Sequence, residues 1–252
     1  MKTLEQIKTK TKTNIVALWA APRCVSTAFL KTFSQRSDTT IIHEPFCNIY
    51  YFSQWRISDR FGDAEEHHNY DAEEAMKKIL SPDSSLVFFK DMAYLALPYL
   101  DLQFLPSITN TFIIRSPREA LASWYRANVC PSEDEFGFTA LEKMWEIVVE
   151  QLGQKPLVVE GNRFRRQPEK ILQSYCQNIG VEFDNKMLTW QEGKLQNWSE
   201  HEAQFHAVWH STLDNSKGII SPKPEKITIR PEDLAMVERA EEIYDKLSKF
   251  AL

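Results

Sequence analysis

The stretch Ile15–Thr27, with the sequence IVALWAAPRCVST, decides the fold of this chain. Its apolar part, Ile15–Ala20, is typical of a strand buried on both faces of a parallel sheet. A helix is predicted directly afterwards, with Ser26 or Thr27 as its N-cap. Because a helix N-terminus offers unpaired backbone N–H groups and a partial positive charge, this strand-to-helix turn predicts an anion site.

The predicted anion loop consists of Arg23, Cys24, Val25, Ser26 and Thr27. Arg23 adds a planar guanidinium that is permanently charged. The loop lacks the glycines and the Gly-Lys-Ser/Thr ending of a Walker A loop, so it matches an ordinary nucleoside-triphosphate site poorly. By itself the segment is equally compatible with a capped turn in which Arg23 forms a structural ion pair.

A second apolar run, Thr111–Ile114, leads into another marked helix start. Residues 116–119, SPRE, predict a capping box with serine at the N-cap, proline at the first helical position and glutamate at the third. Arg115 then lies at the carboxyl end of the strand, and Ser123 lies two turns along the helix. Both side chains are expected to face one ligand.

These two motifs resemble those of the sulfotransferase family that uses 3′-phosphoadenosine 5′-phosphosulfate (PAPS) as its sulfuryl donor. The resemblance makes Pro22–Thr27 the loop for the 5′-phosphosulfate and gives the 3′-phosphate to Arg115 and Ser123. It implies PAPS as co-substrate, adenosine 3′,5′-bisphosphate (PAP) as product, and no required metal. Val25 stands where many relatives have glycine, so close approach of the backbone to the phosphosulfate is less assured. Weaker likeness extends over parts of residues 157–180.

Strand and helix patterns alternate along the whole chain, which predicts an α/β fold with helices on both faces of a parallel sheet. The resemblance specifies this as the three-layer, P-loop NTPase-like sulfotransferase fold. Gly153 and Gly180 stand where helix C-caps expect glycine. The predicted strands are Ile15–Ala20, Thr40–His43, Leu86–Phe89, Thr111–Ile114 and Leu157–Glu160. The predicted helices are Thr27–Gln35, Asp71–Leu80, Pro117–Asn128, Thr139–Leu152, Pro168–Ile179 and Pro231–Phe250.

Candidate catalytic groups follow the predicted strands, and ligands of such sheets bind beyond the carboxyl ends of the strands. Sulfuryl transfer needs a base for the acceptor's proton and a cation for the leaving phosphate, the latter expected from Arg23. Glu44 is the preferred base because relatives with a Pro-Arg loop use a carboxylate near this point. His43 is the alternative because the ordinary pKa of histidine lies near working pH. Structural alternatives remain: an ion pair between Glu44 and Arg23, and a packed His43.

Lys90 stands at the end of the third predicted strand, directly after Phe89, and is expected to contact the sulfuryl group or the acceptor. Many cytosolic relatives carry Lys-Thr-His here, whereas this chain has Met92 at the third position, which favours Glu44 as the base. The alternative for Lys90 is an ion pair with Asp91 or Glu44.

Further along the chain, Lys217 and Gly218 are candidates for the loop that closes over the nucleotide in relatives. His206 and His210 are four residues apart, but no third ligand has metal spacing, so no metal site is predicted. The arginines at 163, 165 and 166 are interpreted as a solvated face.

Residues 44–71 are a candidate lid or acceptor wall. They interleave aromatic side chains with carboxylates, a composition that suits a flat or cationic small molecule through stacking and cation–π contact. The alternative is that the aromatic side chains only fill the core. The aromatic members are Phe46, Tyr50, Tyr51, Phe52, Trp55 and Phe61, and the acidic members are Asp59, Asp63, Glu65 and Glu66.

The composition narrows the function classes. With 252 residues and 43% hydrophobic content, the chain supports one substantial core, and the lack of a linker or repeat predicts a single domain over residues 1–252. The net charge of −5 argues against a general nucleic-acid binder. Four cysteines without Cys-x-x-Cys spacing suit a reducing compartment, so the cytoplasm is expected. No apolar stretch is long enough to span a membrane.

The sequence therefore predicts a PAPS-dependent sulfotransferase that acts on a hydroxyl or amine of a small molecule, such as a specialised metabolite. Two alternatives stay open. A P-loop kinase would need ATP and Mg²⁺, against which the missing Gly-Lys-Ser/Thr argues. A non-catalytic nucleotide-binding protein would bind the bisphosphate and transfer nothing. The oligomeric state is left open.

Overall fold

Five parallel strands form the centre of the computed structural model, which describes residues 13–62, 66–195, 209–223 and 226–252. The strand order is β2-β3-β1-β4-β5, so the first strand of the chain lies in the middle of the sheet. The strands are β1 (Asn14–Ala20), β2 (Thr39–His43), β3 (Leu86–Met92), β4 (Thr109–Ile114) and β5 (Leu157–Glu160).

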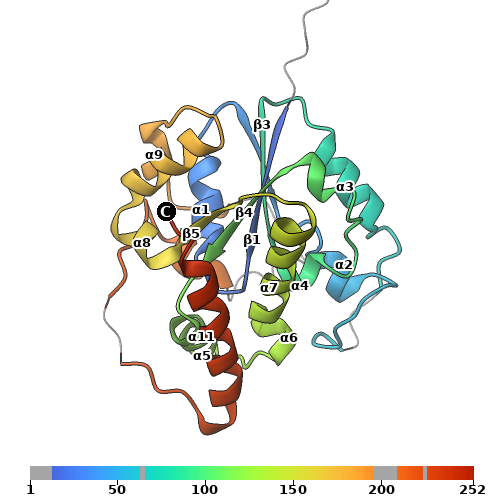
Figure 1. Ribbon diagram of the computed structural model, residues 1–252, viewed down its shortest axis with the longest axis vertical. Coiled ribbons are helices and arrows are strands. Elements are labelled where there is room, and N and C mark those ends of the chain that lie inside the picture. The colour runs from blue at the N-terminus through green and yellow to red at the C-terminus, as the bar shows by residue number, and fades with distance from the viewer. Residues whose placement is uncertain (1–12, 63–65, 196–208, 224–225) are drawn as a thin grey trace, which may run out of the picture.

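Helices connect the strands and cover both faces of the sheet (Figure 1). Those on one face are α1 (Ser26–Phe33), α8 (Gly161–Arg166) and α9 (Pro168–Asn178). Those on the other are α2 (Cys47–Phe52), α3 (Ala72–Leu80), α4 (Ala93–Ala96), α5 (Pro117–Arg126), α6 (Glu133–Phe136), α7 (Phe138–Glu146) and α11 (Leu234–Ser248). Short helical turns complete the connections: η2 (Leu105–Ser107), η3 (Ile147–Gln151), η4 (Asn185–Leu188) and η5 (Pro231–Asp233).

Alternating side chains of β1 belong to two separate hydrophobic cores, one on each face of the sheet. Val16 and Leu18 pack with the α1 residues Phe29 and Phe33 on one face, whereas Trp19 packs with Phe89 on the other. All six side chains are fully buried. The α/β three-layer prediction is therefore confirmed, because a strand buried on both faces needs a helical layer on each side.

All five predicted strands are present, but β3 is longer than its apolar run. The prediction ended this strand at Phe89, whereas the ladder continues through Lys90 paired with Leu18 and Asp91 paired with Trp19. Lys90 and Asp91 are consequently buried inside the sheet. Backbone pairing with the central strand overrides the polar character of these two residues.

One predicted N-cap is wrong, and at a second, correctly predicted N-cap the capping box does not form. The N-cap of α1 is Val25, and neither Ser26 nor Thr27 caps the helix, since Ser26 is already its first residue. Ser116 is the N-cap of α5 with proline after it, as predicted, but its side chain accepts no capping hydrogen bond. The glutamate at 119 pairs with Arg115 instead, and this ion pair replaces the capping box.

The helix predicted over Thr139–Leu152 is divided into the α-helix α7 and the π-helical turn η3. The C-cap predictions are confirmed, because Gly153 and Gly180 have φ angles of 64° and 74° at the ends of η3 and α9. The structure also contains short helices that the sequence analysis did not predict, namely α2, α4, α6 and α8.

Candidate functional site

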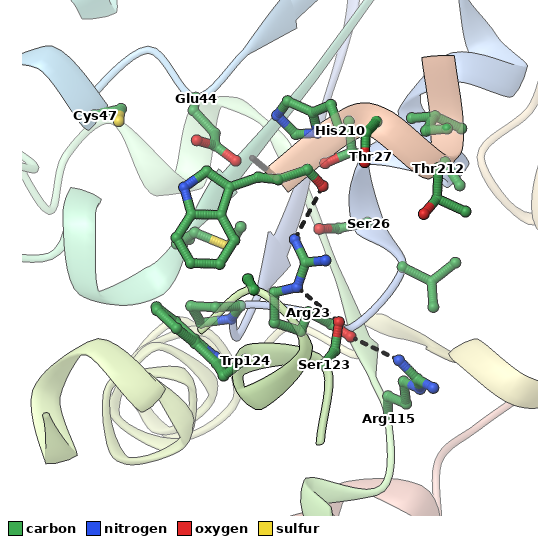
Figure 2. A pocket seen from close by; sticks show the side chains of 18 of the residues that line it. Arg23, Ser26, Thr27, Glu44, Cys47, Arg115, Ser123, Trp124, His210 and Thr212 are labelled. Carbon is green, nitrogen blue, oxygen red and sulfur yellow. Dashed lines mark hydrogen bonds between the residues drawn. The ribbon is translucent and has the colours of Figure 1, made fainter. Parts of the chain in front are cut away.

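A cavity of about 430 Å³ opens at the carboxyl edge of the sheet, and Figure 2 shows side chains that line it. The anion loop, Arg115, the C-terminal half of α5 and the segment of residues 209–220 surround one part of the cavity. Residues of α2 and α4 and the loop that follows α2 surround the other part. Most sequence-predicted site residues line it, namely Arg23, Val25, Ser26, Thr27, Glu44, Arg115, Ser123 and Gly218.

The two predicted anion sites are in direct contact. Arg23 Nε donates a hydrogen bond to Ser123 Oγ at 2.9 Å, and Arg115 Nη1 donates one to the carbonyl oxygen of Arg23 at 3.2 Å (Figure 2). Arg115 and Ser123 are 9% and 8% exposed, so both hold fixed positions at the cavity wall. The parallel order of β1 and β4 produces this meeting, because neighbouring parallel strands end at the same edge.

The anion loop has an unusual backbone for its sequence. Arg23 and Val25 have φ angles of 64° and 71°, in the left-handed region that residues with a Cβ rarely occupy. Val25 thus adopts the conformation that a glycine would favour, in spite of its branched side chain. Cys24 does not line the cavity, because its side chain is fully buried, and burial raises the pKa of its thiol to about 12. The prediction that Cys24 contacts the ligand is therefore corrected, because the structure does not bring this residue to the cavity.

Arginine dominates the charge of the cavity. Five arginines and one glutamate carry the charged side chains among the described lining residues: Arg23, Arg60, Arg115, Arg126, Arg165 and Glu44. Burial, together with repulsion from Arg115 and Arg126, lowers the pKa of Arg23 to about 10. Burial and the charge of Arg115 also lower the pKa of Arg165. Clustered guanidinium groups that repel one another are stabilised by a bound anion.

Sequence reasoning missed three of these arginines, namely Arg60, Arg126 and Arg165. Arg126 lies three residues beyond Ser123 on α5, and this helical spacing places it on the same side of the helix. Arg165 was interpreted as part of a solvated face, yet it lines the cavity, because α8 begins directly after β5 at the same carboxyl edge. The rule that ligands bind beyond the strand ends was sufficient to find Arg165.

Glu44 reaches the cavity from the end of β2, and buried basic groups hold it. Lys90 Nζ forms an ion pair with Glu44 Oε1, and His43 Nε2 lies 3.4 Å from the same oxygen. The side chains of His43 and Lys90 are fully buried, whereas that of Glu44 is 10% exposed. Neither His43 nor Lys90 lines the main cavity, although His43 lines a second cavity on the other side of Glu44.

The expected contact of Lys90 with a ligand is therefore corrected. Because β3 continues past Lys90, its ammonium group lies within the sheet and contacts Glu44, the alternative that the sequence analysis kept open. The alternative of an ion pair between Glu44 and Arg23 is not observed, and Glu44 pairs with Lys90. Lys90 thus positions a carboxylate at the cavity wall.

Lys217 is another predicted residue that the structure does not bring to the cavity. Its side chain is 77% exposed and lies 3.5 Å from Glu192, whereas its neighbour Gly218 lines the cavity. The described residues that cover the anion loop include Trp209, whose carbonyl oxygen accepts a hydrogen bond from Arg23 at 3.2 Å. His210 lines the cavity, and His206 lies outside the described residues.

The predicted acceptor wall contributes three of its six aromatic side chains to the cavity and neither of the two predicted carboxylates that the structure describes. Tyr51, Phe52 and Phe61 line the cavity, while Trp55 is 62% exposed. Asp59 and Glu66 are exposed and do not line it. Asp63 and Glu65 lie outside the described residues.

Within residues 13–62, 66–195, 209–223 and 226–252, no cluster of three His, Cys, Asp or Glu side chains is arranged for a metal ion. The same part of the chain contains no helix of the length and apolarity that a membrane span requires.

Two proteins of Arabidopsis thaliana have sequences similar to this chain. Branched-chain-amino-acid aminotransferase-like protein 1 is 23% identical over 235 residues, which cover 92% of this chain and 41% of that protein. Branched-chain-amino-acid aminotransferase-like protein 2 is 25% identical over 225 residues, which cover 87% and 39%. The chain thus spans about two fifths of the length of these relatives.

Similar solved structures include the sulfotransferase domain of the Synechococcus PCC 7002 olefin synthase, at 16% identity and a TM-score of 0.47, with 96% of this chain and 98% of that chain covered. Another is mouse sulfotransferase SULT7A1 complexed with PAP, at 12% identity and a TM-score of 0.45, with 95% of this chain and 90% of that chain covered.

The family model described as sulfotransferase domain matches residues 13–248. Since this match includes both anion motifs and nearly the whole chain, the protein belongs to the sulfotransferase domain family.

Proposed function

We propose that this protein transfers a sulfuryl group from PAPS to a hydroxyl or amine of a small molecule. The observation that carries the proposal is the direct contact between Arg23, Ser123 and Arg115 at one cavity wall. The sequence motifs assign Arg23 to one end of a doubly phosphorylated nucleotide and the other two residues to its second end. In the structure these residues are close enough for one nucleotide to bridge, with Glu44 in the same cavity.

The charges of the cavity suit this donor. A phosphomonoester carries about −1.5 to −2 at neutral pH, and the phosphosulfate adds further negative charge. Arg23, Arg115, Arg126 and Arg165 supply positive charge, and the first turn of α1 supplies backbone N–H groups without helical partners. A nucleotide with two separate anionic ends offsets the mutual repulsion of these arginines better than a single phosphate does.

The reaction follows from these placements. The oxygen or nitrogen of the acceptor attacks sulfur, a bond forms between that atom and sulfur, and the bond from sulfur to the bridging phosphate oxygen breaks. Glu44 takes the acceptor's proton. The electron pair of the broken bond goes to the phosphate of PAP, where Arg23 stabilises the new negative charge. Lys90 keeps the Glu44 carboxylate in position.

A melting-temperature screen tests the donor class. PAP without magnesium is expected to stabilise the protein, by about 2.7 kcal/mol at 100 times its dissociation constant. ATP with Mg²⁺ is the comparison, since a P-loop kinase would require it. Stabilisation by ATP with Mg²⁺ and not by PAP rejects the proposal. PAP binding without release of PAP from PAPS across a panel of hydroxyl and amine acceptors would favour the non-catalytic alternative.

The cytoplasm is the proposed location, because the four cysteines of the chain are all free thiols. The proposed partner is a small molecule, with neither a nucleic acid nor a membrane. Purification under oxidising conditions is expected to leave all four thiols available to a thiol reagent after denaturation.

A further inference from the structure

Four aromatic side chains line the part of the cavity beside Glu44, and we call them the aromatic wall: Tyr51, Phe52, Phe61 and Tyr94. The rings of Phe52 and Phe61 stack with centroids 5.2 Å apart, and Tyr51 meets Phe61 edge-on at 4.9 Å. Tyr51, Phe52 and Tyr94 are 7%, 2% and 8% exposed, so packing holds them in place. A wall of rigid rings favours contact with a flat molecule.

Charges at the aromatic wall cancel in pairs. Arg60 donates to both carboxylate oxygens of the buried Glu135, and Lys90 pairs with Glu44. Glu44 is the only carboxylate among the described lining residues, since Asp59 and Glu66 lie exposed outside the lining, and it is already paired. Elsewhere the cavity carries an excess of arginine. Because the anionic ends of the bound nucleotide offset those arginines, a cationic acceptor finds no uncompensated carboxylate among the described residues beside the wall, and an anionic acceptor finds no uncompensated cation there.

A chain of hydrogen bonds fixes the polarity of the tyrosine hydroxyl groups. Tyr51 Oη donates to Glu135 Oε1 at 3.5 Å and lies 2.8 Å from Tyr94 Oη. Although burial opposes it, hydrogen bonds from Arg60 hold the pKa of Glu135 below its ordinary value, so Glu135 accepts and does not donate. Tyr51 gives its proton to Glu135, and Tyr94 then gives its own proton to Tyr51. The remaining lone pair of Tyr94 Oη accepts from a ligand.

We infer that the aromatic wall takes an uncharged, planar acceptor, and that Tyr94 Oη selects it by accepting a hydrogen bond from a second donor group on that molecule. This inference rests on the function proposed above and names its substrate class. It replaces the broader expectation of a flat or cationic acceptor, because Tyr51, Phe52 and Phe61 line the cavity whereas Asp59 and Glu66 lie outside it.

The test uses one planar scaffold with four substituents, and binding is measured by calorimetry on protein saturated with PAP. The probes are 2,6-dihydroxynaphthalene, 6-methoxy-2-naphthol, the cation of 6-aminomethyl-2-naphthol and the anion of 6-hydroxy-2-naphthoic acid. The dihydroxy compound is expected to bind about three- to tenfold more tightly than the methoxy compound, the range for one neutral hydrogen bond. Both charged compounds are expected to bind at least tenfold more weakly than the dihydroxy compound.

Two variants assign the selection to Tyr94. Tyr94→Phe keeps the ring and is expected to abolish the preference for the dihydroxy compound without changing PAP affinity. Tyr51→Phe frees the Tyr94 proton, so Tyr94 can donate to the methoxy oxygen and the preference is expected to shrink or reverse. Tyr99→Phe is the matched control, because Tyr99 Oη donates to the Trp55 carbonyl outside the cavity lining.

Separate outcomes reject the inference and the proposed function. Equal binding of the dihydroxy and methoxy compounds, equal or tighter binding of a charged compound, or no binding of any probe overturns the inference. An unchanged preference in both tyrosine variants overturns the role of Tyr94. Failure of PAP itself to bind rejects the proposed function instead.

Discussion

Arg23 makes the contacts that join the two anion sites. Its guanidinium donates to Ser123 and to the carbonyl of Trp209, and it lies 5.2 Å from the centre of the Trp209 ring. These groups are neutral, so none of them compensates the arginine charge. A bound phosphosulfate would supply the missing negative charge, at the cost of rearranging these neutral contacts.

The first prediction concerns Arg115. Arg115→Ala is expected to weaken PAP binding by about 1.5–3 kcal/mol, the range for a hydrogen bond to a charged group. Calorimetry measures the change. Arg118→Ala is the control, because Arg118 starts the same helix but pairs with Glu241 at the surface. PAP affinity equal to that of the wild type in Arg115→Ala would remove the 3′-phosphate assignment.

The second prediction concerns Glu44. Glu44→Gln is expected to lower kcat by about 10²–10⁴ and to leave PAP affinity almost unchanged, since a general base acts only on the acceptor's proton. The variant also leaves the buried Lys90 without its carboxylate, which is expected to lower the free energy of unfolding by about 3–5 kcal/mol. Urea unfolding measures this loss, and kcat is compared at a temperature where the variant is folded.

Lys90→Met separates the two effects of the Glu44 variant. It breaks the same ion pair but retains the carboxylate, so its kcat is expected to exceed that of Glu44→Gln. If Glu44→Gln kept wild-type turnover, the role of base would pass to His43, which lies beside the same carboxylate.

At the scale of elements, the anion loop depends on the turn between α6 and α7. Gly137 in this turn has a φ of 79°, and a Cβ there would lie 2.7 Å from Cδ of Pro22. Pro22 immediately precedes Arg23. The turn and the loop are therefore packed so closely that only glycine fits between them.

The third prediction follows from this packing. Gly137→Ala is expected to lower the free energy of unfolding by more than Gly153→Ala and to weaken PAP binding. Gly153 also has a positive φ, but its added Cβ would meet no atom within 4 Å. The control, Gly153→Ala, is expected to lower the free energy of unfolding only by the conformational cost of a left-handed alanine, about 1–2 kcal/mol, and to bind PAP normally. Equal losses in both variants would show that the contact with Pro22 is unimportant.

At the scale of the whole molecule, buried thiol and phenol groups make stability depend on alkaline pH. Burial raises the pKa of Cys24 and of Tyr50 to about 12 and that of Cys176 to about 11. A group with a raised pKa in the folded state stabilises the protein below its ordinary pKa and loses that contribution as the pH rises through the folded value. Arg23 has the opposite effect on stability, because its pKa is lowered to about 10 in the folded protein. As the pH rises through that value, the unfolded chain binds more protons at this group than the folded protein does, so the contribution of Arg23 to stability increases.

The fourth prediction is the net result: the free energy of unfolding falls as the pH rises from about 9 to about 12. Urea midpoints measured in steps across this range check it. Cys176→Ser removes one buried thiol and is expected to flatten the decline, whereas Cys130→Ser, at an exposed position, is expected to change it less. A urea midpoint that stays constant from pH 9 to 12 contradicts the prediction.

The local pattern of the sequence determined the elements and the candidate anion sites. Apolar runs located all five strands, because strands buried on both faces of a parallel sheet must be apolar throughout. The run ending at Ile114 placed Arg115 at a strand end, and the helical spacing placed Ser123 beside it. These inferences use neighbours in the chain, so they needed no tertiary structure.

Only the tertiary structure decided which polar groups meet at the cavity. The insertion of β1 between β3 and β4 brings Arg23 to Ser123, and the backbone ladder carries Lys90 into the sheet, where it pairs with Glu44. Arg165 arrives at the cavity from a different strand end, and Lys217 turns away from it. The physical reason is that strand order, ladder length and side-chain direction depend on contacts between distant segments, which local periodicity does not encode.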